Sequence, residues 1–357
     1  MPENTRSTPR KAHQATTIKD VAKLAGVSVA TVSRVLSDHN YVRDEVRWRV
    51  QKAIAELSYR PNRVARSLRA QRSKFIGLII SDIENPFYTA LVRAVEDVAY
   101  ARQYSLLLCN SDEDPDKERI YIEFMRDEQV AGVITSPTAE NLTSLQVLMD
   151  AKIPVVAVDR RAKKTPVDTV MLDHAKSAYL LANHLVSQGH TRIGMVIGST
   201  TTTSGRERKR GFLKALKEAG VTPNPELMRE VKPVEEAGFQ AVLGLLSLPQ
   251  PPTALFIGNN LLTIGALKAI QQKKLRIPRD ISLVGHDELP WMSLLAPGIT
   301  VAAQPVYDLG RQAMDLLMAR IKGDTQPPRE IKLDPTLIIR QSVGQPIAYP
   351  TNGKIKV

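Results

Sequence analysis

The sequence has few of the groups from which proteins build disulfides, thiolate metal sites or membrane anchors. Its 357 residues include one cysteine, Cys109, which excludes an internal disulfide and any site made of several cysteines. No apolar run approaches the roughly 18 residues of a membrane span. The first sixteen residues lack the apolar core of a secretory signal. We therefore expect a cytoplasmic protein in which Cys109, within the run SLLLCN, is a buried strand thiol.

Motifs that mark common enzyme sites are also missing. The sequence contains no G-x-x-x-x-G-K-[ST], G-x-G-x-x-G, H-E-x-x-H or G-x-S-x-G pattern. Scattered Asp, His and Arg residues do not exclude catalysis, but no motif supports it. We predict that the chain is not an enzyme and that it requires no cofactor and no metal.

Positive charge is concentrated near the start of the chain. Residues 1–73 hold 15 Lys and Arg residues against 6 Asp and Glu residues, whereas the other 284 residues hold 34 against 31. Such an excess is the electrostatic footprint of nucleic-acid binding, and it predicts binding that weakens with salt. An acidic lipid surface is the alternative, but no basic amphipathic helix with an aromatic face accompanies the charge.

Residues 17–41 have the pattern of two short helices joined by a glycine turn. Thr17 can cap the first helix, with Asp20 as its partner in a capping box. Gly26 ends this helix where a left-handed backbone is needed, and Ser28 caps the second. The residues expected to face inward are Val21, Ala22, Leu24, Ala25, Val32, Val35 and Leu36.

The exposed side of the second helix begins with Val29 and Ala30 and carries Ser33 and Arg34. Small apolar groups suit the methyl group of thymine, and an arginine suits guanine or phosphate. A helical hairpin without a role in DNA binding can have the same spacing, so the segments that follow carry part of the argument.

A third helix is expected over residues 44–57, with Trp48 off its apolar stripe but partly buried. Pro61 ends this helix, and the next twelve residues contain four arginines among small apolar residues. That stretch is too short to be a stable helix alone. It is either a solvated linker or a helix that orders only against DNA.

From Lys74 onward, short apolar runs alternate with helical stretches, which indicates parallel sheets covered on both faces. There are too many strands for one doubly wound unit, so two are expected side by side, with ligands beyond the carboxyl ends of the strands. The expected strands are 75–83, 105–110, 130–136, 154–159, 169–173, 192–199, 253–259, 281–287 and 299–304. The expected helices are 86–103, 115–128, 139–151, 174–189, 204–219, 235–247, 260–273 and 305–322.

Several longer motifs follow one another in a fixed order over about residues 17–343. They are DVAKLAGVS, TVSRVL, AIAELSYRPNRVARSLR, IGLIISDIENPFY, GHTRIGMVIG, RKRGF, PTALFIGNN, ALKAI and RIPRDISLVGHDE. In these motifs the chain resembles the LacI/GalR family of bacterial transcriptional repressors. The resemblance implies an all-α helix-turn-helix headpiece and an α/β effector domain of the periplasmic-binding-protein-like type I fold, with two doubly wound subdomains.

The implied domains are a disordered basic arm at 1–16, the headpiece at 17–61, a hinge helix or linker at 62–73, the effector domain at 74–343 and a tail at 344–357. The N-subdomain covers about 74–172 and 305–332, and the C-subdomain covers about 173–304 and 333–343. The implied partners are double-stranded operator DNA with a pseudo-palindromic sequence, a small-molecule effector and a second copy of the chain. A homodimer is expected, with a tetramer as the alternative, and no membrane partner is expected.

The resemblance places DNA contacts on the helix that begins at Ser28 and on the hinge. Leu68 matches the hinge leucine that wedges into the minor groove at the operator centre. The expected DNA-binding residues are Thr17, Ser28, Val29, Ala30, Thr31, Ser33, Arg34, Asn40, Asn62, Ala65, Arg66 and Leu68. Arg43 departs from the family pattern, in which a serine usually caps the third helix.

Arg208 and Asp287 match the arginine and the carboxylate with which the family binds effectors, a charged pair that can fix a polar ligand. Arg208 could instead be a solvated helix arginine, and Asp287 a helix cap. The expected effector-binding residues are Phe87, Tyr88, Ser136, Asp159, Arg160, Asp173, Arg208, Asn259, Asp287 and Trp291.

The ligand implied by the resemblance is a sugar, a sugar acid or a phosphorylated sugar. An acidic ligand is favoured if Arg160 faces the cleft beside Arg208. Alternatives with the same role in DNA binding are a nucleoside or purine ligand and a protein co-regulator. A sugar-binding protein without a role at DNA is a further alternative, but it leaves residues 17–73 unexplained.

Overall fold

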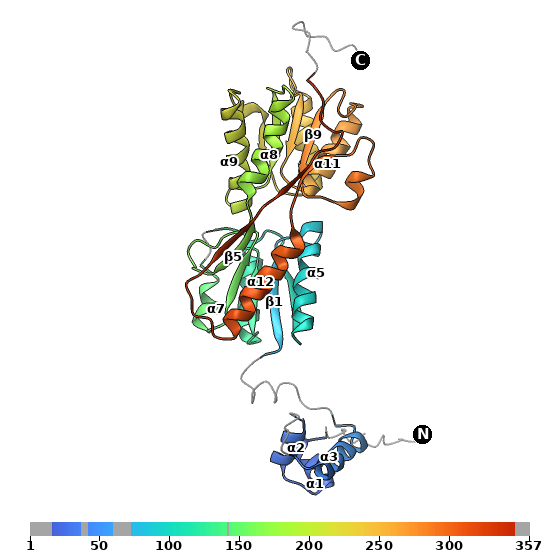
Figure 1. Cartoon of the computed structure of the whole chain (residues 1–357), viewed down its shortest axis with the longest axis vertical. Helices are drawn as coiled ribbons and strands as arrows, with labels where there is room; N and C mark the ends of the chain where they lie inside the picture. Colours follow the sequence, from blue (N-terminus) through green and yellow to red (C-terminus); the bar gives the residue numbers. More distant parts are fainter. Residues whose placement is uncertain (1–15, 37–41, 60–72, 141–142, 347–357) are drawn as a thin grey trace, which may run out of the picture. The chain divides into compact units, whose positions relative to one another are not determined.

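The computed structural model describes residues 16–36, 42–59, 73–140 and 143–346. Its internal contacts divide the chain into two compact units, Met1–Arg72 and Ser73–Val357. Figure 1 shows the helices of the first unit and the larger, two-lobed second unit.

The described residues of the first unit form three helices, namely α1 (Ile18–Ala25), α2 (Val29–Leu36) and α3 (Asp44–Glu56). The carboxylate of Asp20 holds the start of α1, because it accepts hydrogen bonds from the Thr17 backbone N–H at 2.8 Å and from the Thr17 hydroxyl at 2.7 Å. Gly26 ends α1 with a φ of 61°, a left-handed conformation that glycine adopts without strain. The predicted helix, glycine turn and helix are thus confirmed.

The core of the first unit is small and excludes two residues that were expected to be buried. It is formed by Val21, Ala22, Ala25, Val32, Val35, Val50 and Ala53. Leu24 is 48% exposed, so its predicted burial is wrong. Its position lies roughly 100° around the α1 axis from the centre of the buried stripe. The expected partial burial of Trp48 is also wrong, since that side chain is 61% exposed, with the Lys52 ammonium 5.2 Å from its ring centre.

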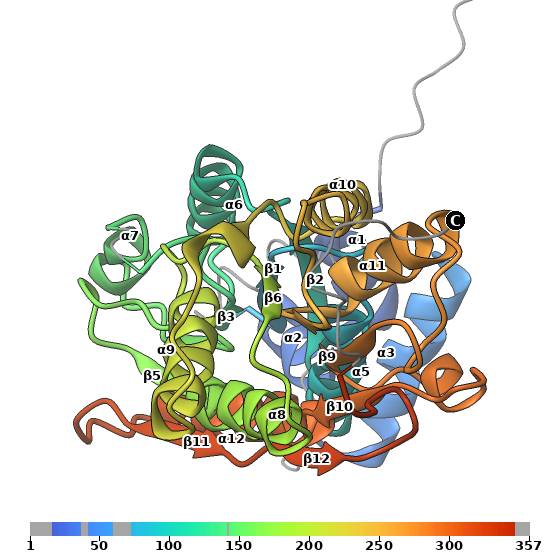
Figure 2. The same cartoon turned by 90° about the horizontal axis from the view of Figure 1, so that it is seen from above.

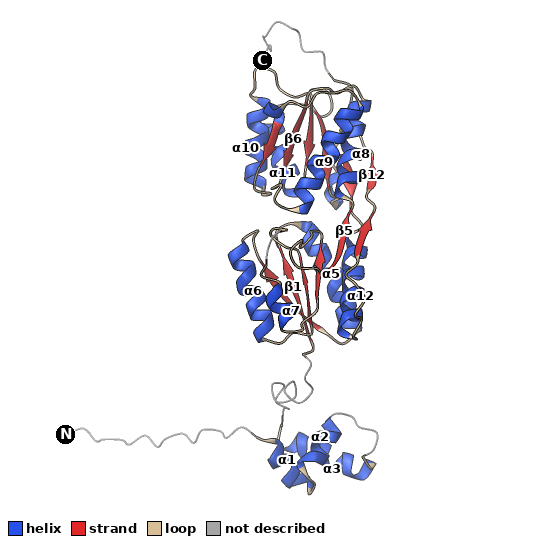
Figure 3. Cartoon of the chain, turned by 90° about the vertical axis from the view of Figure 1, so that its left-hand side faces the viewer, coloured by secondary structure: helices blue, strands red, loops and turns tan. Residues whose placement is uncertain are grey.

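The second unit has two lobes, each built on a six-stranded sheet. In the N-lobe the strand order is β11-β5-β4-β3-β1-β2, and all neighbours are parallel. Its strands are β1 (Phe75–Ile80), β2 (Ser105–Asn110), β3 (Gly132–Thr135), β4 (Val155–Val158), β5 (Asp168–Leu172) and β11 (Glu330–Leu333). Helices α5 (Pro86–Ala101) and α12 (Val306–Ile321) cover one face, and α6 (Pro115–Asp127) and α7 (Gln146–Asp150) cover the other (Figure 3).

The C-lobe repeats this plan with one antiparallel strand. Its order is β12-β10-β9-β8-β6-β7, and only the β10–β12 pair is antiparallel. The strands are β6 (Ile193–Ile197), β7 (Met228–Glu230), β8 (Ala254–Ile257), β9 (Ser282–His286), β10 (Thr300–Ala303) and β12 (Thr336–Ile338). Helices α8 (His174–Ser187) and α9 (Thr203–Glu218) pack on one face, and α10 (Glu235–Leu246) and α11 (Asn260–Gln272) on the other (Figure 2). The 3-10 turns η1 (Pro225–Leu227) and η2 (Pro290–Ser293) complete the lobe.

The chain crosses between the lobes after β5, after β10 and between β11 and β12 (Figure 1). The predicted α/β class, with two doubly wound parallel-sheet subdomains, is therefore confirmed. Because the strands of both sheets are parallel except for β12, the carboxyl ends of the parallel strands gather polar side chains at one edge of each lobe.

Some local predictions for the second unit were wrong. Of the helix expected over 139–151, the described residues form only α7. Strands β7, β11 and β12 were not predicted, since they lie at sheet edges, are only partly buried and lack a long continuous apolar run. Cys109 is half-buried rather than buried, because β2 is an edge strand.

The described residues contain neither a membrane-spanning helix nor a metal-binding cluster. In this part of the chain no helix is long and apolar enough to cross a membrane. Among the same residues, no group of three or more His, Cys, Asp or Glu side chains is arranged to hold a metal ion.

Candidate functional site

A cleft of about 830 Å³ lies between the two lobes, at the carboxyl ends of their strands. Seven of the predicted effector-binding residues line it: Phe87, Tyr88, Asp159, Arg160, Arg208, Asn259 and Asp287. Ser136, Asp173 and Trp291 do not line it. Ser136 lies behind the lining residue Tyr88, with the two hydroxyls in contact. Asp173 caps α8 by accepting a hydrogen bond from the Lys176 N–H at 2.9 Å. Trp291 packs on the C-lobe core.

Arg208 lines the cleft, and its charge acts on two carboxylates of the lining, Asp159 and Asp287. It projects from α9 and donates from Nη1 to the Gly258 carbonyl at 2.6 Å, while its Nε has no protein partner. Asp159 follows β4 and Asp287 follows β9, and both have left-handed backbones with φ of 65° and 69°. Strain of this kind in non-glycine residues is concentrated at functional sites. The paired charges and the unused donor make this the polar centre of the cleft.

The two carboxylates differ in their pKa shifts. Burial alone would raise the pKa of Asp159, but a hydrogen bond from His174 and the charges of His174, Arg160 and Arg208 bring it below its usual value. Burial raises the pKa of Asp287, and neither the charge of Arg208 nor the hydrogen bond from Gln304 offsets this. The cleft thus holds one carboxyl stabilised as the anion and one whose anion is disfavoured.

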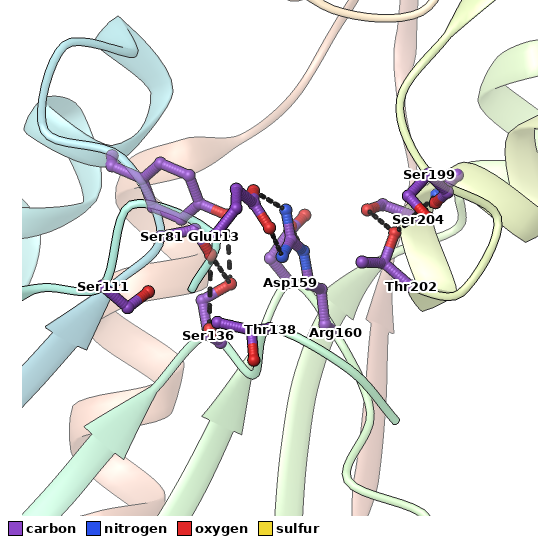
Figure 4. Close-up of polar contacts among 12 residues, drawn as sticks. Ser81, Ser111, Glu113, Ser136, Thr138, Asp159, Arg160, Ser199, Thr202 and Ser204 are labelled. Carbon is purple, nitrogen blue, oxygen red and sulfur yellow. Dashed lines mark hydrogen bonds and ion pairs between the residues drawn. The ribbon is translucent and has the colours of Figure 1, made fainter. Parts of the chain in front are cut away.

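Arg160 and Glu113 form an ion pair on the N-lobe side of the cleft, which we call the Arg160–Glu113 bar (Figure 4). The guanidinium donates to both carboxylate oxygens, with Nη2–Oε1 and Nη1–Oε2 distances of 2.6 and 2.7 Å. Arg160 follows β4 and Glu113 follows β2, so the pair passes over the ends of β3 and β1, which lie between those strands. Sequence reasoning missed Glu113, because the contact depends on the order of strands in the sheet.

Aromatic and hydroxyl side chains lie around and beneath this bar. The Tyr88 hydroxyl and the Ser136 hydroxyl are 3.0 Å apart, and the ring of Phe87 meets that of Tyr88 edge-on with centres 4.9 Å apart. Burial raises the pKa of Tyr88, so its hydroxyl stays protonated. Phe87 and Tyr88 follow Asn85, whose side chain caps α5 by accepting a hydrogen bond from the Phe87 N–H at 2.9 Å.

The opposite wall of the cleft, from the C-lobe, is rich in hydroxyl groups. Figure 4 shows Ser199, Thr202 and Ser204 across from Arg160 and Glu113. Thr202 caps α9, since its Oγ1 accepts from the Gly205 N–H at 3.3 Å and donates to the Ser199 carbonyl at 2.8 Å. A Cβ at position 205 would lie 2.1 Å from that carbonyl oxygen, so only glycine fits there. These hydroxyls and Gln304, which closes β10, were also missed, although the rule on strand ends could have found Gln304.

Glu140 joins the two lobes outside the cleft. Its side chain is 3% exposed and accepts hydrogen bonds from both terminal nitrogens of Arg206, Nη1 and Nη2, at 2.6 and 2.5 Å. It also accepts a hydrogen bond from the Thr203 hydroxyl. Lys163 of the N-lobe lies 2.8 Å from the same carboxylate. Burial acts to raise the pKa of Glu140, but Arg206, Lys163 and Thr203 lower it to about 2. We call this set of contacts the Glu140 bridge.

A second contact between the lobes involves two buried amides. The Asn260 side chain, at the start of α11, donates to the Asn85 side-chain oxygen at 2.8 Å. The structure therefore has the lobes in direct contact on two sides of the cleft.

The predicted DNA-binding residues of the first unit lie mostly on α2. Ser28, Ala30 and Arg34 are exposed, and Val29, Thr31 and Ser33 are half-buried. Ser28 caps the helix, because its Oγ accepts from the Thr31 N–H at 3.1 Å. Thr17 is exposed at the start of α1. Asn40, Asn62, Ala65, Arg66 and Leu68 lie outside the described residues.

Both units are similar to known protein families. Residues 17–62 match the family model described as "Bacterial regulatory proteins, lacI family", and residues 182–343 match "Periplasmic binding protein-like domain". The HTH-type transcriptional repressor PurR of Edwardsiella ictaluri is 38% identical over 331 residues, which cover 92% of this chain and 96% of PurR.

Two solved structures are similar in fold and, at lower identity, in sequence. The lac repressor dimer bound to operator and the anti-inducer ONPF has a TM-score of 0.82 at 28% identity, covering 93% of this chain and 100% of that one. The transcriptional regulator CelR in complex with cellobiose has a TM-score of 0.70 at 28% identity, covering 92% of this chain and 99% of that one.

Proposed function

The chain belongs to the lacI family of bacterial regulatory proteins, and from that premise we propose that it binds its operator as a homodimer under the control of a neutral polar ligand. It is a DNA-binding transcriptional repressor with a ligand-binding domain. The observation that carries the proposal is the polar cleft of the second unit, in a chain whose first unit is a helix-turn-helix.

On the DNA side, α2 is the recognition helix. Val29 and Ala30 contact base edges, Arg34 contacts guanine or phosphate, and Ser28 and Thr17 position the two helix starts. Two copies of the chain place two such helices about one turn of DNA apart, which requires a pseudo-palindromic operator. Residues 62–73 are the proposed hinge between residues 17–61 and the effector domain.

On the ligand side, the charge of the cleft favours a neutral molecule. Its lining contains seven carboxylates, namely Asp82, Asp112, Glu113, Asp114, Asp159, Glu230 and Asp287. The four cations of the lining are Lys117, Arg160, Arg208 and Lys232. Arg160 is paired with Glu113, and the charge of Arg208 acts on Asp159 and Asp287. An acidic sugar would therefore meet an excess of like charge.

Two classes of neutral ligand suit this lining. The hydroxyl wall of the C-lobe and the carboxylates suit a sugar, whose hydroxyls both donate and accept hydrogen bonds. CelR, similar to this chain, has cellobiose in its solved complex. A purine base is the second candidate, because Phe87 and Tyr88 lie in the lining beside Asp287 and Gln304, whose groups match the edge of a base.

Binding of the ligand closes or opens the lobes and thereby changes the arrangement of the two headpieces. Since operator and ligand act on one equilibrium, each must change the affinity of the other by the same factor. The proposal includes no catalytic step, and the protein acts in the cytoplasm, where its DNA lies.

The test combines a ligand screen with a DNA-binding measurement. Sugars, sugar acids, phosphosugars, nucleosides and purine bases are screened by thermal shift, because a ligand that binds only the folded state raises its melting temperature. A neutral hit that changes operator affinity supports the proposal. An acidic ligand as the strongest hit contradicts the charge argument, and no hit in any class favours control by a protein partner.

A further inference from the structure

The Arg160–Glu113 bar occupies a part of the cleft where Arg160 could otherwise bind an anionic group of a ligand. Arg160 has a side chain only 8% exposed, and that of Glu113 is 19% exposed. The guanidinium also donates to the Pro137 carbonyl at 3.3 Å, so its position is set from two directions. Both residues line the cleft.

Within the described lining, Arg160 is already matched by carboxylates. Glu113 takes up both terminal nitrogens of Arg160, and Asp159 lies 3.6 Å from its Nε. The bonds to Glu113 and Pro137 use three of the five guanidinium N–H groups, and the remaining edge, at Nε, lies beside the Asp159 carboxylate, so an incoming phosphate or carboxylate meets a carboxylate on either edge. An anion would have to displace Glu113, and the displaced carboxylate would remain in the same partly dry space.

We propose that the Arg160–Glu113 bar is a specificity filter, in which Glu113 occupies the anion-binding face of Arg160 and so excludes acidic ligands from the cleft. The inference rests on the proposed function, because it concerns the ligand of the same cleft. It makes Glu113 the residue that separates neutral ligands from their phosphorylated or acidic forms. A chain with the same arginine and no carboxylate at position 113 would favour anions.

The geometry supports a filter rather than a purely structural pair. Glu113 and its neighbour Asp112 have left-handed backbones with φ of 60° and 53°. The strained loop after β2 thus directs Glu113 across the sheet to Arg160, although the two side chains come from strands that are not neighbours. Other bidentate arginine pairs of the second unit, such as Arg340 with Glu288, lie outside this cleft lining.

The test is titration with inorganic phosphate, at constant ionic strength set with chloride, by calorimetry and thermal shift. Three full-length proteins are compared: the wild type, Glu113→Gln and the double variant Glu113→Gln/Arg160→Gln. We expect Glu113→Gln to bind phosphate about 10- to 100-fold more tightly than the wild type, as a freed charge-assisted hydrogen bond allows. The double variant should return to the wild-type affinity.

Three results would overturn the filter. They are a folded Glu113→Gln protein that binds phosphate no more tightly than the wild type, equal affinity in the single and double variants, and binding of millimolar phosphate by the wild type itself. Glu113→Ala provides a second variant that frees Arg160 if the glutamine variant is unstable. The test on the wild type does not depend on the folding of any variant, and binding of millimolar phosphate in its cleft would contradict the inference.

Failure of the proposed function gives a different pattern. If no ligand changes operator affinity, the regulatory proposal fails, while the phosphate titrations still report on the charge of the cleft. If operator control is intact but the Glu113→Gln protein gains no affinity for phosphate, only the filter fails.

Discussion

Replacing Glu140 by glutamine removes the one charge on which the Glu140 bridge depends. The carboxylate accepts from Arg206 and Thr203 of the C-lobe and pairs with Lys163 of the N-lobe. Glutamine has nearly the same size, so the core should not change. What is lost is the attraction between one buried anion and two cations.

The size of the effect follows from the pKa of Glu140. A fall from 4.5 to about 2 corresponds to about 3 kcal/mol in favour of the folded anion. Lys163 and Arg206 are 54% and 35% exposed, and water screens their charges, so the expected loss is smaller. We expect Glu140→Gln to lower the free energy of unfolding by about 1–2 kcal/mol at pH 7.

The pH dependence gives the same prediction an independent readout. Because the folded pKa of Glu140 is depressed, its contribution is complete above about pH 4.5 and is lost as pH falls towards 2. The gap between wild type and Glu140→Gln should therefore narrow below pH 4.5. Urea unfolding at a fixed protein concentration measures both quantities, since association of subunits would otherwise shift the midpoint.

The matched control is Glu123→Gln on α6. Glu123 pairs with Arg119 of the same helix at 3.2 Å, and its side chain is 44% exposed. An exposed helix pair of this kind contributes about 0.5 kcal/mol or less. Equal losses in the two variants at pH 7, or a gap for Glu140→Gln that does not change with pH, would refute the reasoning.

Three further predictions concern the turn, the cleft and the DNA-binding helix. Gly26→Ala should destabilise the headpiece by about 1–2 kcal/mol in thermal unfolding, because Gly26 has a left-handed backbone with a φ of 61°. The control is Gly244→Ala within α10, where an added Cβ would have nothing within 4 Å. This substitution should be neutral or stabilising. Asp287→Asn should weaken ligand binding at least about tenfold. The melting temperature should not change, because asparagine tolerates the left-handed backbone at this position. The control, Asp173→Asn, lies outside the cleft lining and should bind the ligand normally. Arg34→Ala should weaken operator binding and reduce the slope of log affinity against log salt by about one if Arg34 contacts phosphate, and an unchanged slope would argue against that contact.

The parts of this protein that could be predicted from the sequence are those set by local pattern and by strand ends. The turn at Gly26 follows from neighbouring residues. Asp159 follows from its place at a strand end, and Arg208 and Asp287 follow from motifs shared with the family, and all three of these residues line the cleft. Glu113 could not be found in this way, because its partner is 47 residues away on a strand that is not adjacent.

Burial was harder to predict where an element is short or at an edge. Leu24 lies on an eight-residue helix with room for only a narrow buried stripe. Cys109 lies on an edge strand, so one side of its apolar run remains open. In both cases the residue type favours burial, but the tertiary surroundings decide it.

The central claim is that one chain couples the cleft to operator DNA, and fluorescence anisotropy tests it directly. A labelled duplex, selected from random sequences by the protein itself, is titrated with the full chain in the presence and absence of a ligand found in the thermal-shift screen. The account predicts a change in operator affinity of about 5- to 150-fold, matched by an equal change in ligand affinity when operator is bound. An operator affinity that stays the same with every ligand that fills the cleft would contradict it.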